Sequence, residues 1–192
     1  MGIEYERKFK LNDPTFFALA AAFCRDAKTI QMETTYYDTP SGALSSRHYT
    51  LRLRLENGKS VCTLKTPAGE ARNEWETENT SIEDAIPQLI AQGAPAELQE
   101  LAKEGLSPIC GAKFTRLAKI IPITEGELEM ALDYGKLFAG DREVPLCELE
   151  LELKSGNKKS FDLFVWSVAG EYLLEEETDS KFCRAFRLYK GE

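Results

Sequence analysis

The stretch that decides the fold is CELELELK, residues 147–154, in which three glutamates alternate strictly with three leucines. Successive side chains of a β-strand point to opposite faces, so residues two apart share a face. The three glutamates therefore occupy one face of a predicted strand, and the three leucines occupy the other. The apolar face needs a layer of other side chains to cover it, and the acidic face needs either water or cations.

The same alternation recurs elsewhere in the chain, and this recurrence is the main signal in the sequence. It is found in EYERK (4–8), TLRLRLE (50–56) and NEWETE (73–78). Each segment places charged side chains on one face, and in the second and third segments leucines or a tryptophan lie opposite. These patterns predict half-buried strands with one charged face each.

Turn and capping residues predict the elements between these strands. Asn57-Gly58 is suited to a tight turn with positive φ, so it predicts a hairpin between 48–56 and 59–66. Asp13 is the expected N-cap of a helix whose first residue is Pro14. Further strands are expected at 34–38, 71–79, 113–123, 126–133 and 143–154, and helices at 81–105, broken by Pro87 and Gly93-Ala94-Pro95, and at 158–169. We predict a single domain over residues 1–192.

Composition limits the class of protein. A chain of 192 residues with 43% hydrophobic content can bury a core without disulfides. The five cysteines are scattered and form no CxxC pair, which argues against a disulfide framework or a zinc site. No apolar run is long enough to cross a bilayer, and we expect a cytoplasmic protein. The net charge of −8 argues against a broad nucleic-acid or membrane surface.

The charged faces allow two interpretations. On the outside of a sheet they are simply solvated, and two carboxylates about 7 Å apart repel by only about 0.6 kcal/mol in water. Facing inward, the same pair costs about 2 kcal/mol at an effective dielectric near 20, so an enclosed space would require cations. Lys8, Arg52, Arg54 and Lys65 lie on predicted strands and supply them. Such a space would suit hard divalent cations and a polyanion together.

Several charged motifs occur in an order that resembles one known family. Glu4-x-Glu6-x-Lys8, TYYDTP, LRLR, TLK, a Glu-x-Glu strand, FTR and CELELEL are similar to the motifs of CYTH-type triphosphate tunnel metalloenzymes. ALDYGKLFAG and PLCELELELKSG look most like the CYTH domain of bacterial inorganic triphosphatases. The resemblance runs from residue 2 to about residue 188. Many bacterial members carry a further helical, histidine-rich domain, which we expect this chain to lack.

The resemblance implies an α+β fold, in which an eight-stranded antiparallel β-barrel forms a tunnel with a charged interior and is flanked by helices. It also implies roles for charged residues at the matching positions. The expected ligands of Mg²⁺ or Mn²⁺ are Glu4, Glu6, Glu148 and Glu150, with Glu74, Glu76 and Asp133 as second-metal ligands or as partners that orient the basic residues. The expected triphosphate-binding residues are Arg52, Arg54, Lys65, Arg116 and Lys181. Lys8 is expected beside the metal-bound phosphate and, with Glu4 and Glu6, in the catalytic set.

The implied reaction is metal-dependent hydrolysis of inorganic tripolyphosphate to pyrophosphate and phosphate by a phosphoanhydride hydrolase. Such a reaction needs charge neutralisation and an aligned water rather than a side-chain nucleophile. Hydrolysis of thiamine or nucleoside triphosphate, a class IV-type adenylate cyclase and a noncatalytic polyphosphate-binding module remain alternatives. Tyr49-Thr50 stands where animal thiamine triphosphatases have a tryptophan, which weakens that alternative. We expect no nucleic acid, no membrane and no obligate protein partner.

Overall fold

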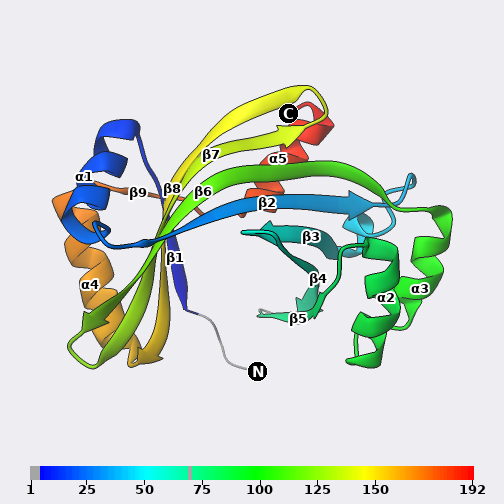
Figure 1. Cartoon of the computed structure of the whole chain (residues 1–192), viewed down its shortest axis with the longest axis horizontal. Helices are drawn as coiled ribbons and strands as arrows, with labels where there is room; N and C mark the ends of the chain where they lie inside the picture. The colour runs from blue at the N-terminus through cyan, green and yellow to red at the C-terminus, as the bar shows by residue number, and fades with distance from the viewer. Residues whose placement is uncertain (1–4, 69–70) are drawn as a thin grey trace. The chain divides into compact units, whose positions relative to one another are not determined.

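The protein is an antiparallel sheet flanked by helices, as the sequence predicts. The computed structural model describes residues 5–68 and 71–192, so Glu4 lies outside the described residues. The sheet has nine strands in the order β5-β4-β3-β2-β6-β7-β8-β1-β9 (Figure 1). The strands are β1 (Glu6–Lys10), β2 (Lys28–Asp38), β3 (Thr50–Glu56), β4 (Lys59–Ala68), β5 (Ala71–Glu78), β6 (Ser107–Ile123), β7 (Gly126–Ala139), β8 (Arg142–Gly156) and β9 (Glu175–Glu176).

Five α-helices are interspersed among the strands along the described chain. They are α1 (Asp13–Phe23), α2 (Ile82–Ala91), α3 (Glu97–Leu101), α4 (Lys158–Glu171) and α5 (Lys181–Lys190), with 3₁₀ turns η1 (Ser45–Arg47) and η2 (Ala102–Glu104). In the described residues, no helix combines the length and the apolar character needed to cross a membrane.

The chain forms two compact units, and each is described by itself. The first unit comprises Met1–Ile30, Phe114–Lys136 and Pro145–Ser180. The second comprises Gln31–Lys113, Leu137–Val144 and Lys181–Glu192. One domain over residues 1–192 stays a prediction.

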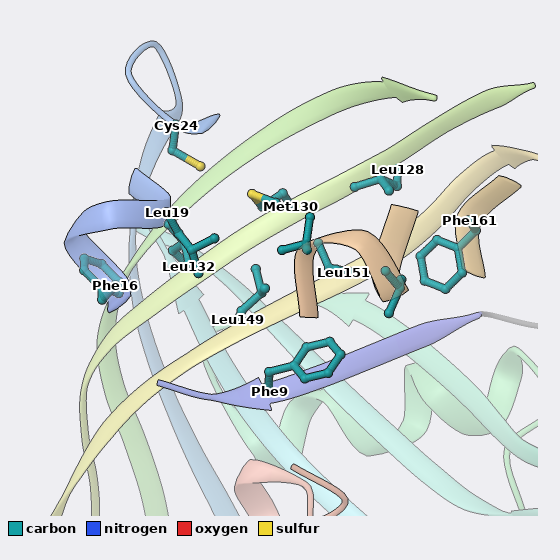
Figure 2. Close-up of a cluster of buried hydrophobic side chains, with 12 residues drawn as sticks. Phe9, Phe16, Leu19, Cys24, Leu128, Met130, Leu132, Leu149, Leu151 and Phe161 are labelled. Carbon is teal, nitrogen blue, oxygen red and sulfur yellow. The ribbon is translucent and has the colours of Figure 1, made fainter. Parts of the chain in front are cut away.

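The core of the first unit covers the leucine face of β8. Leu149 and Leu151 are fully buried and cluster with Phe9 of β1. Figure 2 shows that α1 and α4 contribute to the same cluster, through residues such as Leu19 and Phe161. The leucines of CELELELK therefore have the covering layer that their alternation with glutamate requires.

The core of the second unit covers the leucine face of the arginine strand. Leu51 of β3 and Leu64 of β4 are fully buried and pack with Ile86 and Leu89 of α2. The hairpin that joins β3 to β4 turns at Asn57-Gly58 as predicted. Both turn residues have positive φ, 47° and 88°, which is the conformation a two-residue primed turn requires.

Two local predictions are wrong in detail. Asn12, not Asp13, caps α1, because its side chain accepts the Thr15 N–H at 2.9 Å. Pro87 lies inside α2 instead of breaking it, since burial of the helix's apolar face outweighs the lost hydrogen bond. The eight predicted strands are present as β1–β8, and the two-residue β9 adds to the sheet by pairing with β1.

The two leucines Leu64 and Leu55 of the β3–β4 hairpin provide a test of this core. Leu64 is fully buried, whereas Leu55 is 42% exposed. We expect Leu64→Ala to lower the free energy of unfolding by about 2–5 kcal/mol, because it leaves a cavity against α2. Leu55→Ala is the matched control and should cost less than about 1 kcal/mol. Urea denaturation followed by circular dichroism measures both, and equal losses would contradict the described packing.

Candidate metal and phosphate site

An acidic cluster lies in the first unit, on the face of the sheet opposite the leucines. Asp133 of β7 and Glu148 and Glu150 of β8 each place a carboxylate oxygen within 4.8 Å of the other two. Asp133 and Glu148 have no exposed surface. At this separation each charged pair repels by about 3 kcal/mol at an effective dielectric near 20. The cluster is therefore stable only with positive charge close by.

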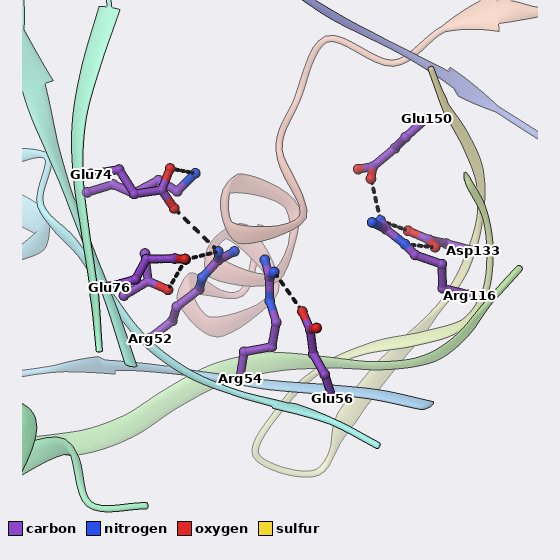
Figure 3. A network of polar contacts seen from close by, with 10 residues as sticks. Arg52, Arg54, Glu56, Glu74, Glu76, Arg116, Asp133 and Glu150 are labelled. Carbon is purple, nitrogen blue, oxygen red and sulfur yellow. Dashed lines mark hydrogen bonds and ion pairs between the residues drawn. The ribbon is translucent and has the colours of Figure 1, made fainter. Parts of the chain in front are cut away.

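Arg116 of β6 supplies part of that charge. Its Nε and Nη2 donate to the two carboxylate oxygens of Asp133 at 2.7 Å each, and Nη2 also contacts Glu150 (Figure 3). Burial by itself would lower the pKa of Arg116, but the hydrogen bonds and charges of the two carboxylates outweigh burial and raise it. The guanidinium thus stays charged and links two members of the acidic cluster.

The pairing of β1 with β8 adds the N-terminal motif to the same face. Lys8 is opposite Glu150, and Glu6 is opposite Glu152. Side chains directly opposite each other in an antiparallel pair lie on one face of the sheet. Glu6 and Lys8 therefore belong to the acidic face, and their expected roles in metal binding and catalysis stay predictions. The predicted ligand Glu4 lies outside the described residues.

The donor set fits a hard divalent cation. All three atoms of the acidic cluster are carboxylate oxygens, which are the ligands that Mg²⁺ and Mn²⁺ prefer. Oxygens that share one Mg²⁺ at about 2.1 Å lie up to about 4.2 Å apart, so small side-chain rotations bring this set into range. The residues that could hold such an ion are Asp133, Glu148 and Glu150.

A second charged cluster lies in the second unit and centres on the arginines of β3. Nη2 of Arg52 lies 3.7 Å from one carboxylate oxygen of Glu74 and 3.7 Å from one of Glu76. The Arg52 side chain is only 12% exposed. Burial lowers the pKa of Arg52, and the neighbouring charge of Arg54 adds to this effect. Two cations in this position repel each other and favour an anion between them.

The acidic residues of β5 contact the basic residues of the same cluster. Lys65 Nζ lies 2.8 Å from Glu74, and the Thr63 hydroxyl donates to Glu76 at 2.9 Å. Burial alone would raise the pKa of Glu74, but the hydrogen bond to Lys65 and the nearby positive charges lower it. Glu74 and Glu76 thus lie among cations.

Two donors of the arginine cluster lack acceptors. The Nε atoms of Arg52 and Arg54 are buried and donate to no described residue. Arg54 Nη1 donates to Glu56 at 3.1 Å. The Nε atom of the same guanidinium has no acceptor among the described residues. An unmade hydrogen bond from a buried donor costs about 1–3 kcal/mol, and more when the donor is charged. An oxyanion that accepts from both arginines would remove this cost.

Tyr36, in the TYYDTP segment, is a buried residue of this cluster to which the sequence patterns assign no role. Tyr36 is opposite Arg52 in the β2–β3 register, and its ring lies 4.9 Å from Phe182 of α5. Burial raises the pKa of Tyr36. The positive charges that oppose this increase belong to Arg52, Arg54 and Lys181. Three predicted phosphate-binding cations therefore act on one buried hydroxyl, and the only sequence signal for it is the position of Tyr36 on the charged face.

Comparison with known proteins gives the family. A sequence profile of the CYTH domain matches residues 2–183. The chain belongs to the CYTH family. It is 31% identical over 159 residues to the inorganic triphosphatase of Haemophilus influenzae. The matched region covers 80% of this chain and 45% of that protein. YjbK of Bacillus subtilis, described as a candidate triphosphatase, is 34% identical over 92 residues, covering 47% of this chain and 48% of that protein.

Solved structures share the fold of this CYTH chain at low sequence identity. HpAC1 from Hippeastrum, described as an adenylyl cyclase candidate with a dominant triphosphatase activity, superposes with a TM-score of 0.72. It is 20% identical and covers 96% of this chain and 95% of its own. PH1819 from Pyrococcus horikoshii superposes with a TM-score of 0.61 at 19% identity. The superposition covers 98% of this chain and 99% of PH1819. The CYTH chain spans about half the length of the curated relatives that it matches.

Metal binding by the acidic cluster can be measured without any substrate. We expect Mn²⁺ alone to raise the melting temperature of the protein, because the ion binds the folded carboxylates and not the unfolded chain. Glu150→Gln should reduce this shift and weaken binding by at least about tenfold, since it removes a charged oxygen ligand.

Glu127→Gln is the matched control, because Glu127 is an exposed glutamate of β7. Isothermal titration with Mn²⁺ should give the same affinity for this variant as for the wild type. Equal affinities for all three proteins would show that the acidic cluster does not bind the ion.

Proposed function

We propose that this CYTH domain hydrolyses inorganic tripolyphosphate to pyrophosphate and phosphate, with Mg²⁺ or Mn²⁺ as cofactor. The observation that carries the proposal is the arginine pair of β3, whose buried Nε atoms lack acceptors. Buried guanidinium groups without acceptors suit a ligand that offers several oxyanions, and a triphosphate does so. The similarity to an inorganic triphosphatase supports the same choice.

In this proposal the acidic cluster binds the metal. Asp133, Glu148 and Glu150 supply the described oxygen ligands, with Glu6 on the same face. When bound, a divalent cation neutralises phosphate charge and makes a bound water more acidic. Arg116 holds Asp133 and Glu150 in place and limits the repulsion between them. Lys8, opposite Glu150, would donate hydrogen bonds to a phosphate oxygen beside these carboxylates.

The arginine cluster binds the phosphates in this proposal. Arg52, Arg54 and Lys65 neutralise the triphosphate, and Lys181 adds a fourth positive charge beside Tyr36. Glu74 and Glu76 orient Arg52 and Lys65 through the contacts described above. Phosphoryl transfer of this type needs positioning and charge neutralisation, which these residues supply, and no nucleophilic side chain.

Three other functions use the same charges. Thiamine or nucleoside triphosphates would need a recognition surface for their organic group, and a cyclase would act on an α-phosphate. A noncatalytic polyphosphate-binding module would need the arginine cluster but not the acidic cluster. The acidic cluster, with two carboxylates at 0% exposure, favours metal-dependent hydrolysis over binding alone. We place the activity in the cytoplasm, where the five cysteines stay reduced.

A substrate panel tests the proposed reaction. The protein is incubated with tripolyphosphate, ATP or thiamine triphosphate, each with Mg²⁺ or Mn²⁺, and released phosphate is measured. We expect the highest kcat/KM with tripolyphosphate and loss of activity in EDTA, because without metal the phosphates and carboxylates repel each other. Cyclic AMP from ATP would support a cyclase instead. Full turnover in metal-free buffer would overturn the mechanism.

Replacing the arginines of β3 tests their role. We expect Arg52→Ala and Arg54→Ala each to reduce kcat/KM by about 10²-fold or more, because each removes a preorganised donor to phosphate. Tripolyphosphate with metal should raise the melting temperature of the wild type and that of these variants much less. Lys59→Ala, in the exposed start of β4, is the matched control. Equal melting shifts in all four proteins would mean that the arginines are merely solvated.

A further inference from the structure

Helix α4 of the first unit is apolar on two sides. Its inner side packs into the core through Phe161, Val165 and Val168, all of which are buried. Its outer side carries Leu163 and Trp166, which are 55% and 65% exposed. A surface helix normally turns charged or polar residues outward, opposite its core face. Two large apolar side chains one turn apart on the outer side are therefore unusual.

The exposed residues follow the spacing of a helix–helix contact. Lys159, Leu163, Trp166 and Gly170 are separated by four, three and four residues, so they form one stripe along the helix. Leu173, just after the helix, is 90% exposed. We call Leu163 and Trp166 the outer stripe. Exposed tryptophan and leucine in one stripe are typical of a surface that another helix covers.

Helix α1 extends the apolar surface beside α4. The two helices pack against each other, with the Phe23 ring 6.2 Å from the ring of Phe164. Both cover the same side of the first unit's strands (Figure 2). The outer side of α1 exposes Phe17, at 63%, and small apolar residues after it, Ala18, Ala21 and Ala22. The surface is thus a layer of two helices whose exposed apolar residues lie beside the Lys158–Asp162 ion pair.

Helix α4 carries four charged residues, of which Lys158 and Asp162 pair with each other at 2.6 Å. The other two, Lys159 and Glu171, lie at nearly equal distances from the middle of the outer stripe. Lys159 lies near the first turn of the helix and Glu171 at its last residue, and the midpoint between them is residue 165. The midpoint between Leu163 and Trp166 lies within one residue of this position. Neither Lys159 nor Glu171 makes an ion pair with a described residue, so both charges are available to a partner. A helix with these features is complementary to itself in the antiparallel direction.

We propose that a second copy of this chain covers the outer stripe, with α4 of one copy antiparallel to α4 of the other. In that arrangement Leu163 packs on Trp166 of the other copy, twice by symmetry. Lys159 then lies level with Gly170 and beside Glu171 of the other copy. Gly170 has no atom within 4 Å of an added Cβ, so it leaves room for the long Lys159 side chain. The opposed helix dipoles add to the attraction.

The first experiment measures the mass of the protein in solution. Sedimentation velocity over a series from low to high micromolar concentration should show a dimer for the wild type. Trp166→Asp should give the mass of a single chain with unchanged circular dichroism and unchanged triphosphatase activity. Val144→Asp, at an exposed valine of β8, is the matched control and should remain dimeric. A wild type that stays monomeric throughout would overturn the proposal.

A charge swap tests the antiparallel pairing of α4. Lys159→Glu and Glu171→Lys should each raise the dimer dissociation constant by about tenfold, because each replaces two attractive pairs by two repulsive ones. The variant with both substitutions restores opposite charges across the interface and should return to within about threefold of the wild type. If the double variant binds no more tightly than the single variants, the antiparallel pairing of α4 is wrong and the proposal is overturned.

Discussion

The structure depends on one constraint, which is that charged side chains occupy one face of strands whose other face is buried. In the first unit this constraint places Asp133 and Glu148 in positions without solvent contact. Carboxylates in such positions are stable only if cations lie beside them. The guanidinium of Arg116, held by both oxygens of Asp133, meets part of that need. The remaining negative charge is what makes the cluster suitable for a divalent ion.

In the second unit the charged face of β3 is basic instead of acidic. Arg52 is nearly buried, and its closest described carboxylates are at 3.7 Å, beyond hydrogen-bond distance. Burial and the charge of Arg54 both lower the pKa of Arg52, so the positive charge of this cluster is costly in the described structure. An anion beside the two arginines would reduce that cost. The same reasoning gives a use for the buried Nε atoms of Arg52 and Arg54, which donate to no described residue.

The helices bury the apolar faces of the strands. Leucines of β8 are buried under α1 and α4, and leucines of β3 and β4 are buried under α2. Covering the apolar faces in this way leaves the charged faces available for ligands. Helix α4 has a second apolar side as well, through Leu163 and Trp166, so the element that closes one core also offers a surface for association.

The sequence by itself determined the strands, their two faces and the tight turn. Alternation has a period of two residues, and Asn57-Gly58 fixes its own backbone, so both are local properties that need no partner. The charged motifs also carried the family resemblance and the main candidate residues. The N-cap of α1 is Asn12 and not the neighbouring Asp13, because adjacent polar side chains compete for the same N–H groups.

Only the tertiary structure decided which charges meet. Lys8 lies opposite Glu150, and Arg116 holds Asp133 and Glu150, across separations in the chain that no local pattern encodes. The exposure of Trp166 likewise follows from which side of α4 the core covers. The burial of Tyr36 beside Arg52 depends on the β2–β3 register. Partner choice depends on which strands become neighbours, whereas alternation specifies only the face on which each side chain lies.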